Sequence, residues 1–202
     1  MKYMKPNIIL ASGSPRRRDL LSQIGLTFTV SPAKGEEKIT EDKPEEAVKQ
    51  LASQKAQEVY LSYISEGKLP KGDTWFIGAD TVVAYQNTIL GKPKDEEDAF
   101  NMLHMLQGKG HQVHTGVCII AVNGDGGVSM ETFCETTQVN LYSMTEENIR
   151  EYIRTKEPMD KAGAYAIQGF FAQYIKGISG DYSNVVGLPV GRIGKRLREC
   201  EG

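Results

Sequence analysis

The sequence predicts an α/β protein with a mixed, twisted β-sheet flanked by helices and a cleft between two lobes. Short apolar runs typical of strands alternate with longer segments whose apolar residues recur at helical spacing. The alternation is irregular, and one pair of β-rich runs is joined by a hairpin signal, so the sheet should be mixed. The sequence contains neither an internal repeat nor a low-complexity tract.

Length and composition limit the class of protein. The 202 residues can bury a substantial core, and we expect a single domain over residues 1–202. The net charge of −2 is unlike that of a protein that coats nucleic acid, so any phosphate binding should be local. The sequence has no apolar stretch of membrane-spanning length and no secretory signal at its start, so we expect no membrane partner. Cys118, Cys134 and Cys200 lack metal-ligand spacing, which predicts buried free thiols in a reduced, cytoplasmic setting.

The chain is organised around a strand, a tight turn and a helix at residues 7–25. The small residues of the turn, which include Ser12, allow a ligand to approach the backbone. Ser14 fits the N-cap and Pro15 the first position of a helix that should run to about residue 24. Gly25 fits a left-handed C-terminal cap.

Arg16, Arg17 and Arg18 occupy the first turn of that helix, where they oppose the positive end of the helix dipole. This arrangement is unfavourable unless a polyanion binds there, because the free N–H groups of a helix N-terminus already attract anions. The alternative is that the three arginines are solvent-exposed and only increase solubility. The strand, the turn and the Ser-Pro start together favour an anion site.

Two charged features follow in the next segments. A second strand is expected at residues 26–30, and the polar loop after it contains Glu36 and Glu37, which could be a solvated pair. A strong helix is predicted over residues 44–63, with Lys55 inside its apolar stripe. Such a lysine either extends to solvent or points its ammonium at a buried anion.

Asp80 interrupts an apolar region. A buried strand at residues 75–79 should end at this aspartate, and a second β-branched run follows at residues 81–83. Because an unpartnered buried carboxylate is costly, Asp80 should face a metal, a cation or solvent in a cleft. The alternative is an edge-strand aspartate that points to bulk water.

The middle of the chain predicts a turn, a helix and a hairpin. Lys92 lies between a glycine and a proline on a stiff turn, and a helix is expected over residues 95–107. Two β-rich runs, 111–122 and 128–142, are joined by a hairpin signal. His111 and His114 lie on opposite faces of a strand, so joint metal binding is not expected.

The C-terminal part should contain a helix with a capping box at residues 143–146 that ends near residue 155, then a loop, a strand at residues 170–175 and a closing helix that ends near residue 199. The loop at residues 157–169 mixes small residues with Gln168, whose amide offers both a donor and an acceptor to a flat ligand. Asp181 is interpreted as a turn residue.

Several motifs together resemble the Maf family of small cytoplasmic nucleoside triphosphate pyrophosphatases. They are SGSPRRRDLL at residues 12–21, LASQKA at 51–56, GADTVV at 78–83, GKP at 91–93, DKAGAYAIQG at 160–169 and SNVVGLP at 183–189. The loop motif is similar to that of the branch that hydrolyses dTTP and UTP. The resemblance also implies a Maf/inosine-triphosphatase-like fold, a homodimer and a role in cleaning the nucleotide pool.

The resemblance further implies roles for individual residues. Asp80 would be the catalytic acid/base, and Glu37 with Asp80 would bind Mg²⁺ or Mn²⁺. The residues implied in substrate binding are Ser12, Ser14, Arg16, Arg17, Lys55, Thr81, Lys92 and Gln168, of which Arg16, Thr81 and Gln168 would select the base. Water would attack the α-phosphorus, and a nucleoside monophosphate and pyrophosphate would leave.

Two alternatives remain open. One is the same chemistry on CTP or another modified nucleotide. The other is a non-catalytic regulator of cell division that binds nucleotide or nucleic acid through the basic turn, although we expect no stable nucleic acid partner. Asp80 argues against binding alone, because a carboxylate beside phosphates weakens affinity unless a metal or a catalytic step requires it.

Overall fold

The computed structural model describes residues 6–199, and its central feature is a seven-stranded mixed sheet. The strands follow the order β2-β1-β3-β5-β6-β7, and β4 also pairs with β3. The strands are β1 (Asn7–Leu10), β2 (Thr29–Val30), β3 (Thr74–Tyr85), β4 (Thr88–Leu90), β5 (Gly110–Val122), β6 (Val128–Leu141) and β7 (Ile175–Ser179). β1 runs parallel to β2 and β3, whereas the other pairings are antiparallel. The predicted mixed sheet is confirmed.

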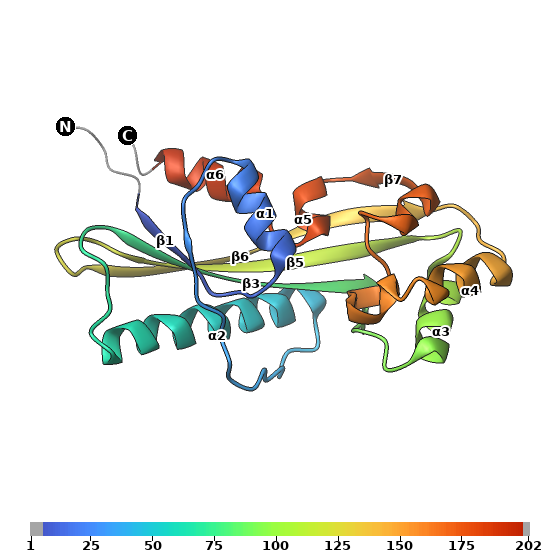
Figure 1. Ribbon diagram of the computed structural model, residues 1–202, viewed down its shortest axis with the longest axis horizontal. Coiled ribbons are helices and arrows are strands. Elements are labelled where there is room, and N and C mark those ends of the chain that lie inside the picture. The colour runs from blue at the N-terminus through green and yellow to red at the C-terminus, as the bar shows by residue number, and fades with distance from the viewer. Residues whose placement is uncertain (1–5, 200–202) are drawn as a thin grey trace.

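Helices cover both faces of the sheet (Figure 1). The α-helices are α1 (Pro15–Gln23), α2 (Pro44–Ser65), α3 (Glu96–Leu106), α4 (Glu146–Arg154), α5 (Tyr182–Val186) and α6 (Val190–Glu199). The long helix α2 lies on one face, α1, α5 and α6 lie on the other, and α3 and α4 lie at one end. No helix in residues 6–199 is long and apolar enough to cross a membrane.

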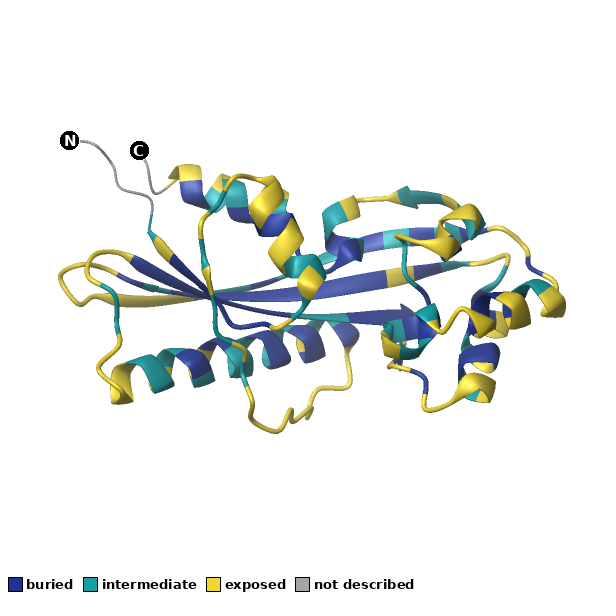
Figure 2. Cartoon of the chain, in the orientation of Figure 1, coloured by how far each residue is buried: buried dark blue, intermediate teal, exposed yellow. Residues whose placement is uncertain are grey.

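Helix α2 packs directly against the sheet backbone. A Cβ atom added to Gly78 would lie 2.2 Å from the carbonyl oxygen of Ala52, and one added to Gly116 would lie 2.2 Å from that of Val48. Both strand positions must therefore be glycine. The face of α2 toward the sheet is buried and its outer face is exposed (Figure 2). This close contact brings the middle of α2 next to the centre of β3.

The strand prediction around Asp80 was wrong in one respect. β3 continues through Asp80 instead of ending there, because β5 pairs with it from Thr74 to Ala84 and places Asp80 opposite Gly116. Pairing along the whole strand outweighs the local preference of a single aspartate. The second predicted strand is shorter than expected and comprises Thr29–Val30 only.

Three C-terminal predictions also need correction. The capping box of α4 joins Thr145 to Asn148, so Ser143 is not the cap. Residues Phe170–Tyr174 form a 3-10 helix, η3, and the strand β7 begins only at Ile175. The closing helix is broken into α5 and α6 at Gly187, whose φ of 129° is poorly accessible to other residues.

The thiols partly follow the prediction. Cys118 is buried and free, and Cys134 is free but only half-buried. Cys134 pairs with Gly116 of β5, but β7 pairs with β6 only at residues 138–141, so no described strand covers β6 on its other side at Cys134. Burial raises the pKa of both thiols, that of Cys134 to about 11. Cys200 lies outside the described residues.

Candidate active site

A cavity of about 660 Å³ opens at one edge of β3. β1 ends with Leu10 paired to Ile77, and β4 first pairs at Val83, so no described strand covers this edge between residues 78 and 82. Residues of two separate apolar clusters, one around α3 and α4 and one around α1 and α6, line the cavity. It therefore lies where the two parts of the core meet, as the predicted cleft requires.

The structure brings the predicted site residues to this cavity. Those that line it are Ser14, Arg16, Arg17, Glu37, Lys55, Asp80, Thr81, Lys92 and Gln168. Ser12 is buried behind them, and its hydroxyl accepts a hydrogen bond from Arg17. Residues far apart in the sequence thus surround the gap in the sheet edge.

On the α2 side of β3, Asp80 and Lys55 form an ion pair. Lys55 Nζ lies 2.5 Å from Asp80 Oδ1 and 3.0 Å from Glu37 Oε1. The side chains of Lys55 and Asp80 are 14% and 15% exposed, whereas that of Glu37 is 54% exposed. Lys55 therefore points at an anion instead of extending to solvent. In this structure the anions are carboxylates, and contact with a phosphate stays a prediction.

The loop that carries Glu37 is attached to α2 by hydrogen bonds. Glu58 accepts from the main-chain N–H groups of Lys34 and Gly35. Gln54 accepts from the N–H of Lys38 and donates to its carbonyl oxygen. These contacts flank Glu37 on both sides and hold its carboxylate beside Lys55.

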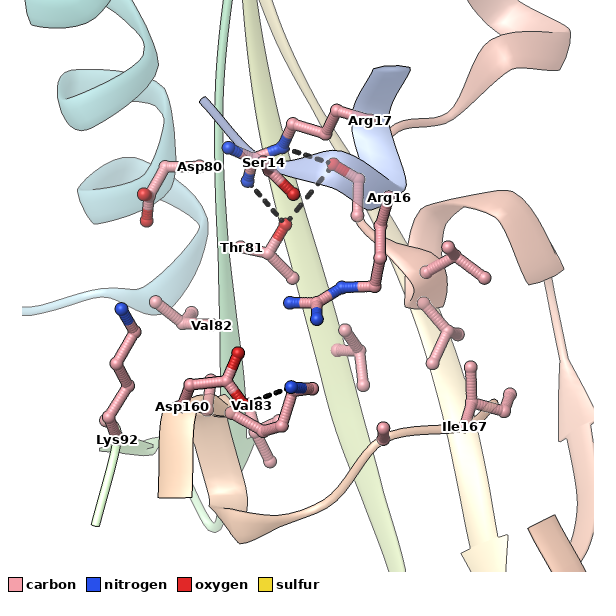
Figure 3. Close-up of a pocket in the computed structure, with 18 of the residues that line it drawn as sticks. Ser14, Arg16, Arg17, Asp80, Thr81, Val82, Val83, Lys92, Asp160 and Ile167 are labelled. Carbon is pink, nitrogen blue, oxygen red and sulfur yellow. Dashed lines mark hydrogen bonds and ion pairs between the residues drawn. The ribbon is translucent and has the colours of Figure 1, made fainter. Parts of the chain in front are cut away.

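On the opposite side of β3, Arg17 is held by three oxygen atoms. Its Nε donates to the carbonyl oxygen of Gly187 at 2.8 Å, Nη1 to Ser12 Oγ at 3.0 Å and Nη2 to Thr81 Oγ1 at 3.2 Å. Figure 3 shows Arg17 directed at Thr81. Burial lowers the pKa of the Arg17 guanidinium, and the nearby Asp80 opposes this effect. A charged group of this kind stays protonated at neutral pH.

The start of α1 follows the prediction in most details. Ser14 occupies the N-cap position and Pro15 the first turn, but the Ser14 hydroxyl caps none of the helix N–H groups that the structure describes. Instead, the N–H of Ser14 donates to Ser12 Oγ at 3.3 Å. The hydroxyl of Ser14 is therefore free of a capping role at the cavity wall.

Arg16 projects into the cavity beside Asp160 (Figure 3).

The loop at residues 157–169 forms the far wall. It contains the short 3-10 helices η1 (Glu157–Asp160) and η2 (Ala162–Ala164). A Cβ at Gly163 would lie 2.8 Å from Val83, so a glycine is needed for the loop to approach β3 this closely.

Sequence reasoning assigned no role to two charged residues of this wall. Asp160 and Lys161 line the cavity and form an ion pair. Their position at the start of the DKAGAYAIQG motif was the available signal. Lys161 is only 15% exposed, and it adds a cation to the wall opposite α1. Lys92 contributes another cation and extends toward Asp80 (Figure 3).

The two histidines of β5 do not converge. His111 Nε2 lies 2.7 Å from the hydroxyl of Tyr165, and His114 Nδ1 lies 2.9 Å from Thr136 Oγ1. Burial lowers the pKa of His111 to about 4 and also lowers that of His114. Both are neutral parts of the interior at pH 7, and no metal-binding group of three residues, with or without them, occurs in residues 6–199.

The cavity nevertheless has donor chemistry that fits a divalent cation. Glu37 and Asp80 both direct a carboxylate oxygen at the Lys55 ammonium, which shows that the two carboxylates share one cation. Mg²⁺ typically uses one or two protein carboxylates and completes its shell with water and substrate phosphate oxygens. Two carboxylates beside a cationic cavity match this pattern.

Sequence comparisons give the family. The profile of the Maf-like proteins matches residues 7–200. The chain is 56% identical over 198 residues to a dTTP/UTP pyrophosphatase of Agathobacter rectalis, covering 95% of this chain and 96% of that protein. It is 47% identical over 192 residues to one of Lachnoclostridium phytofermentans, covering 95% and 94%, and 48% identical over 192 residues to one of a Geobacillus species, covering 95% and 96%. The chain therefore belongs to the Maf family.

Proposed function

We propose that this protein is a nucleoside triphosphate pyrophosphatase that hydrolyses dTTP and UTP to the nucleoside monophosphate and pyrophosphate. The observation that carries the proposal is a carboxylate, Asp80, at a gap in the sheet edge and inside a cavity lined by Arg16, Arg17, Lys55 and Lys92. The names of the three relatives support the choice of nucleotides. The biological role that follows is removal of unwanted nucleotides from the pool.

The cations prepare the triphosphate for attack. A nucleoside triphosphate carries several negative charges, which repel an incoming nucleophile. Each charge-assisted hydrogen bond to a phosphate is worth about 1.5–3 kcal/mol. Arg16 and Lys92 extend into the cavity, where a phosphate can approach them, whereas Lys55 must first exchange a carboxylate for the phosphate.

That exchange connects binding to catalysis. While Lys55 holds Asp80, the ammonium occupies the carboxylate oxygen Oδ1, which is then not free to accept a proton from water. When a phosphate oxygen draws Lys55 away, Asp80 can accept a proton from water as the water oxygen bonds to the α-phosphorus. The bond from the α-phosphorus to the bridging oxygen then breaks, and the cations stabilise the pyrophosphate that leaves. Glu37 and Asp80 would hold Mg²⁺ or Mn²⁺, which supplies charge neutralisation and Lewis acidity when bound.

Selection of the base is assigned to Arg16, Thr81 and Gln168, which lie on different walls of the cavity. A pocket that forms hydrogen bonds rejects an analogue with mismatched groups far better than an apolar pocket does. The proposed cellular location is the cytoplasm. The proposed assembly is a homodimer, and light scattering on the purified protein would test this assembly.

The test is release of pyrophosphate from a panel of nucleoside triphosphates with Mg²⁺, with Mn²⁺ and with a chelator. We expect metal-dependent release that is highest for dTTP and UTP. Highest activity on CTP or a modified nucleotide would retain Asp80 and the chemistry but overturn the choice of substrate. If no nucleotide releases pyrophosphate, the proposal that the protein is an enzyme is wrong, and a nucleotide-binding regulator is favoured.

A further inference from the structure

The side chain of Thr81 continues into a buried chain of hydrogen bonds across the sheet. Thr81 and Thr115 are direct partners in the pairing of β3 with β5, and their hydroxyl oxygens lie 2.9 Å apart. Thr115 is fully buried and donates to the main-chain oxygen of Asn184 in α5 at 2.9 Å. We call these three residues the Thr81–Thr115–Asn184 chain.

Counting protons gives this chain a direction. A threonine hydroxyl has one hydrogen to donate, and a carbonyl oxygen can only accept. Because Thr115 donates its hydrogen to Asn184, it must accept in its contact with Thr81. Thr81 is therefore the donor to Thr115, and it accepts from Arg17 Nη2 at 3.2 Å. The hydrogen of Thr81 is thus used inside the protein, and only acceptor capacity remains for the cavity that this residue lines.

Buried contacts hold the far end of the chain in place. The Asn184 side chain is fully buried, and its amide nitrogen donates to the main-chain oxygen of Val113 at 3.0 Å and to Thr137 Oγ1 at 2.9 Å. Thr137 in turn donates to the main-chain oxygen of Asp181 at 2.9 Å. Reversing any hydroxyl would leave a buried group without its partner, which is costly in a low-dielectric interior. The direction of the Thr81 hydroxyl is therefore stable.

We infer that Thr115 is a positioning residue that makes Thr81 an acceptor-only group, so that the cavity selects a nucleobase with a ring N–H. This inference rests on the proposed function. Uracil and thymine carry an imide N–H, whereas cytosine has a lone pair at the same ring nitrogen. An acceptor that meets a lone pair leaves both groups unpaired, which is the kind of mismatch that hydrogen-bonding sites reject strongly.

Replacement of Thr115 by valine tests the inference, because valine keeps the shape and removes the acceptor of the Thr81 hydrogen. The other acceptor within reach in the described part of the chain is the Gly187 oxygen, which lies 3.5 Å away and is therefore a weak partner for the Thr81 hydroxyl. Thr81 can then donate to a ligand. We expect the ratio of kcat/KM for UTP to that for CTP to fall about tenfold or more in Thr115→Val and to return in Thr115→Ser.

Thr137→Val is the matched control. Thr137 is also fully buried and donates to a main-chain oxygen, but no contact with Thr81 is recorded in residues 6–199. The Thr137→Val variant should lower the melting temperature as Thr115→Val does. It should leave the ratio of kcat/KM for UTP to that for CTP unchanged. Equal losses for UTP and CTP in Thr115→Val, or the same change of ratio in both valine variants, would overturn the inference.

Failure of the proposed function can be separated from failure of this inference. If the wild-type protein releases no pyrophosphate, the preference is measured instead as the ratio of the dissociation constants of CTP and UTP, by calorimetry. A UTP preference that is lost in Thr115→Val would support the selecting role even in a binding protein. Equal affinities of the wild-type protein for both nucleotides would overturn it.

Discussion

Asp80 and Thr81 are neighbours in the sequence, yet their surroundings on the two sides of β3 differ fundamentally. On the α2 side, Asp80 meets Lys55 and the largely exposed Glu37 in a group of charges. On the α1 and α5 side, Thr81 belongs to a network of hydroxyl groups, carbonyl oxygens and the enclosed guanidinium of Arg17.

The difference separates two tasks that one site must perform. The Lys55 and Asp80 side chains are only 14% and 15% exposed, so Lys55 can leave Asp80 only when a phosphate takes the place of the carboxylate as its anionic partner. A buried hydrogen-bond network keeps its direction, because every rearrangement leaves an unpaired group. The α2 side is therefore suited to chemistry, and the α1 and α5 side to recognition.

The largest expected effect is that of Asp80→Asn, which removes the base but keeps the shape. Turnover should fall by about 10² to 10⁴, the usual contribution of general acid–base catalysis, while nucleotide binding persists. Pyrophosphate release and calorimetric binding measure the two effects. Glu46→Gln, an exposed acid of α2 paired with Lys49, is the control and should be neutral. Turnover of Asp80→Asn at the wild-type rate would contradict the mechanism.

Acid pH should destabilise the fold through His111, which contacts neither Asp80 nor Thr81 in the described residues but bonds to Tyr165 in the cavity wall. Its pKa is lowered from 6.5 to about 4 by burial, so the unfolded chain binds a proton at higher pH than the folded protein does. Stability is fully present above pH 6.5 and falls as the pH approaches 4. The loss should be about 3 kcal/mol, because each pKa unit corresponds to about 1.4 kcal/mol.

Urea unfolding between pH 7 and pH 4 measures this loss. The non-titrating variant His111→Gln should have a flatter dependence of unfolding free energy on pH, although its stability at pH 7 will be lower. An equally steep dependence in the variant would assign the effect to other groups.

Arg17→Lys should damage the recognition side. An ammonium cannot reproduce the planar fork that reaches Gly187, Ser12 and Thr81 at once. We expect kcat/KM for UTP to fall by about 10² and the free energy of unfolding by about 2 kcal/mol, since buried oxygens lose donors. Arg18→Lys, at the next and exposed position, should change neither quantity. Because lysine keeps the positive charge, unchanged kcat/KM and unfolding free energy in Arg17→Lys would show that charge alone matters at this position.

Lys55→Met should give the smallest of these effects on catalysis. It removes one cation, and we expect KM for UTP to rise about tenfold, the value of one charge-assisted contact. Metal affinity measured without nucleotide should rise, because Glu37 and Asp80 lose their ammonium partner. Lys49→Met on the same helix is the control. An unchanged metal affinity would indicate that the two carboxylates do not form a joint cation site.

Local chemistry in the sequence was sufficient for much of the fold. Pro15 and Gly25 indicated the limits of α1, and apolar spacing indicated α2 and α3, because these signals act within a few residues. Charge in unfavourable places, such as Asp80 in an apolar strand and Lys55 in an apolar stripe, identified groups that needed partners. The structure places those groups in one cavity, whereas their catalytic roles stay predictions.

The tertiary structure alone decided which partners meet. The strand continues through Asp80 because β5 pairs along its whole length, and this register also places Thr115 opposite Thr81. Arg17 contacts the carbonyl of Gly187, which is 170 residues away in the chain. The role of Thr115 depends on a main-chain oxygen of α5, which no residue type reveals. Residue identity determines what each group can donate or accept, but only packing and register determine which groups come within hydrogen-bond distance.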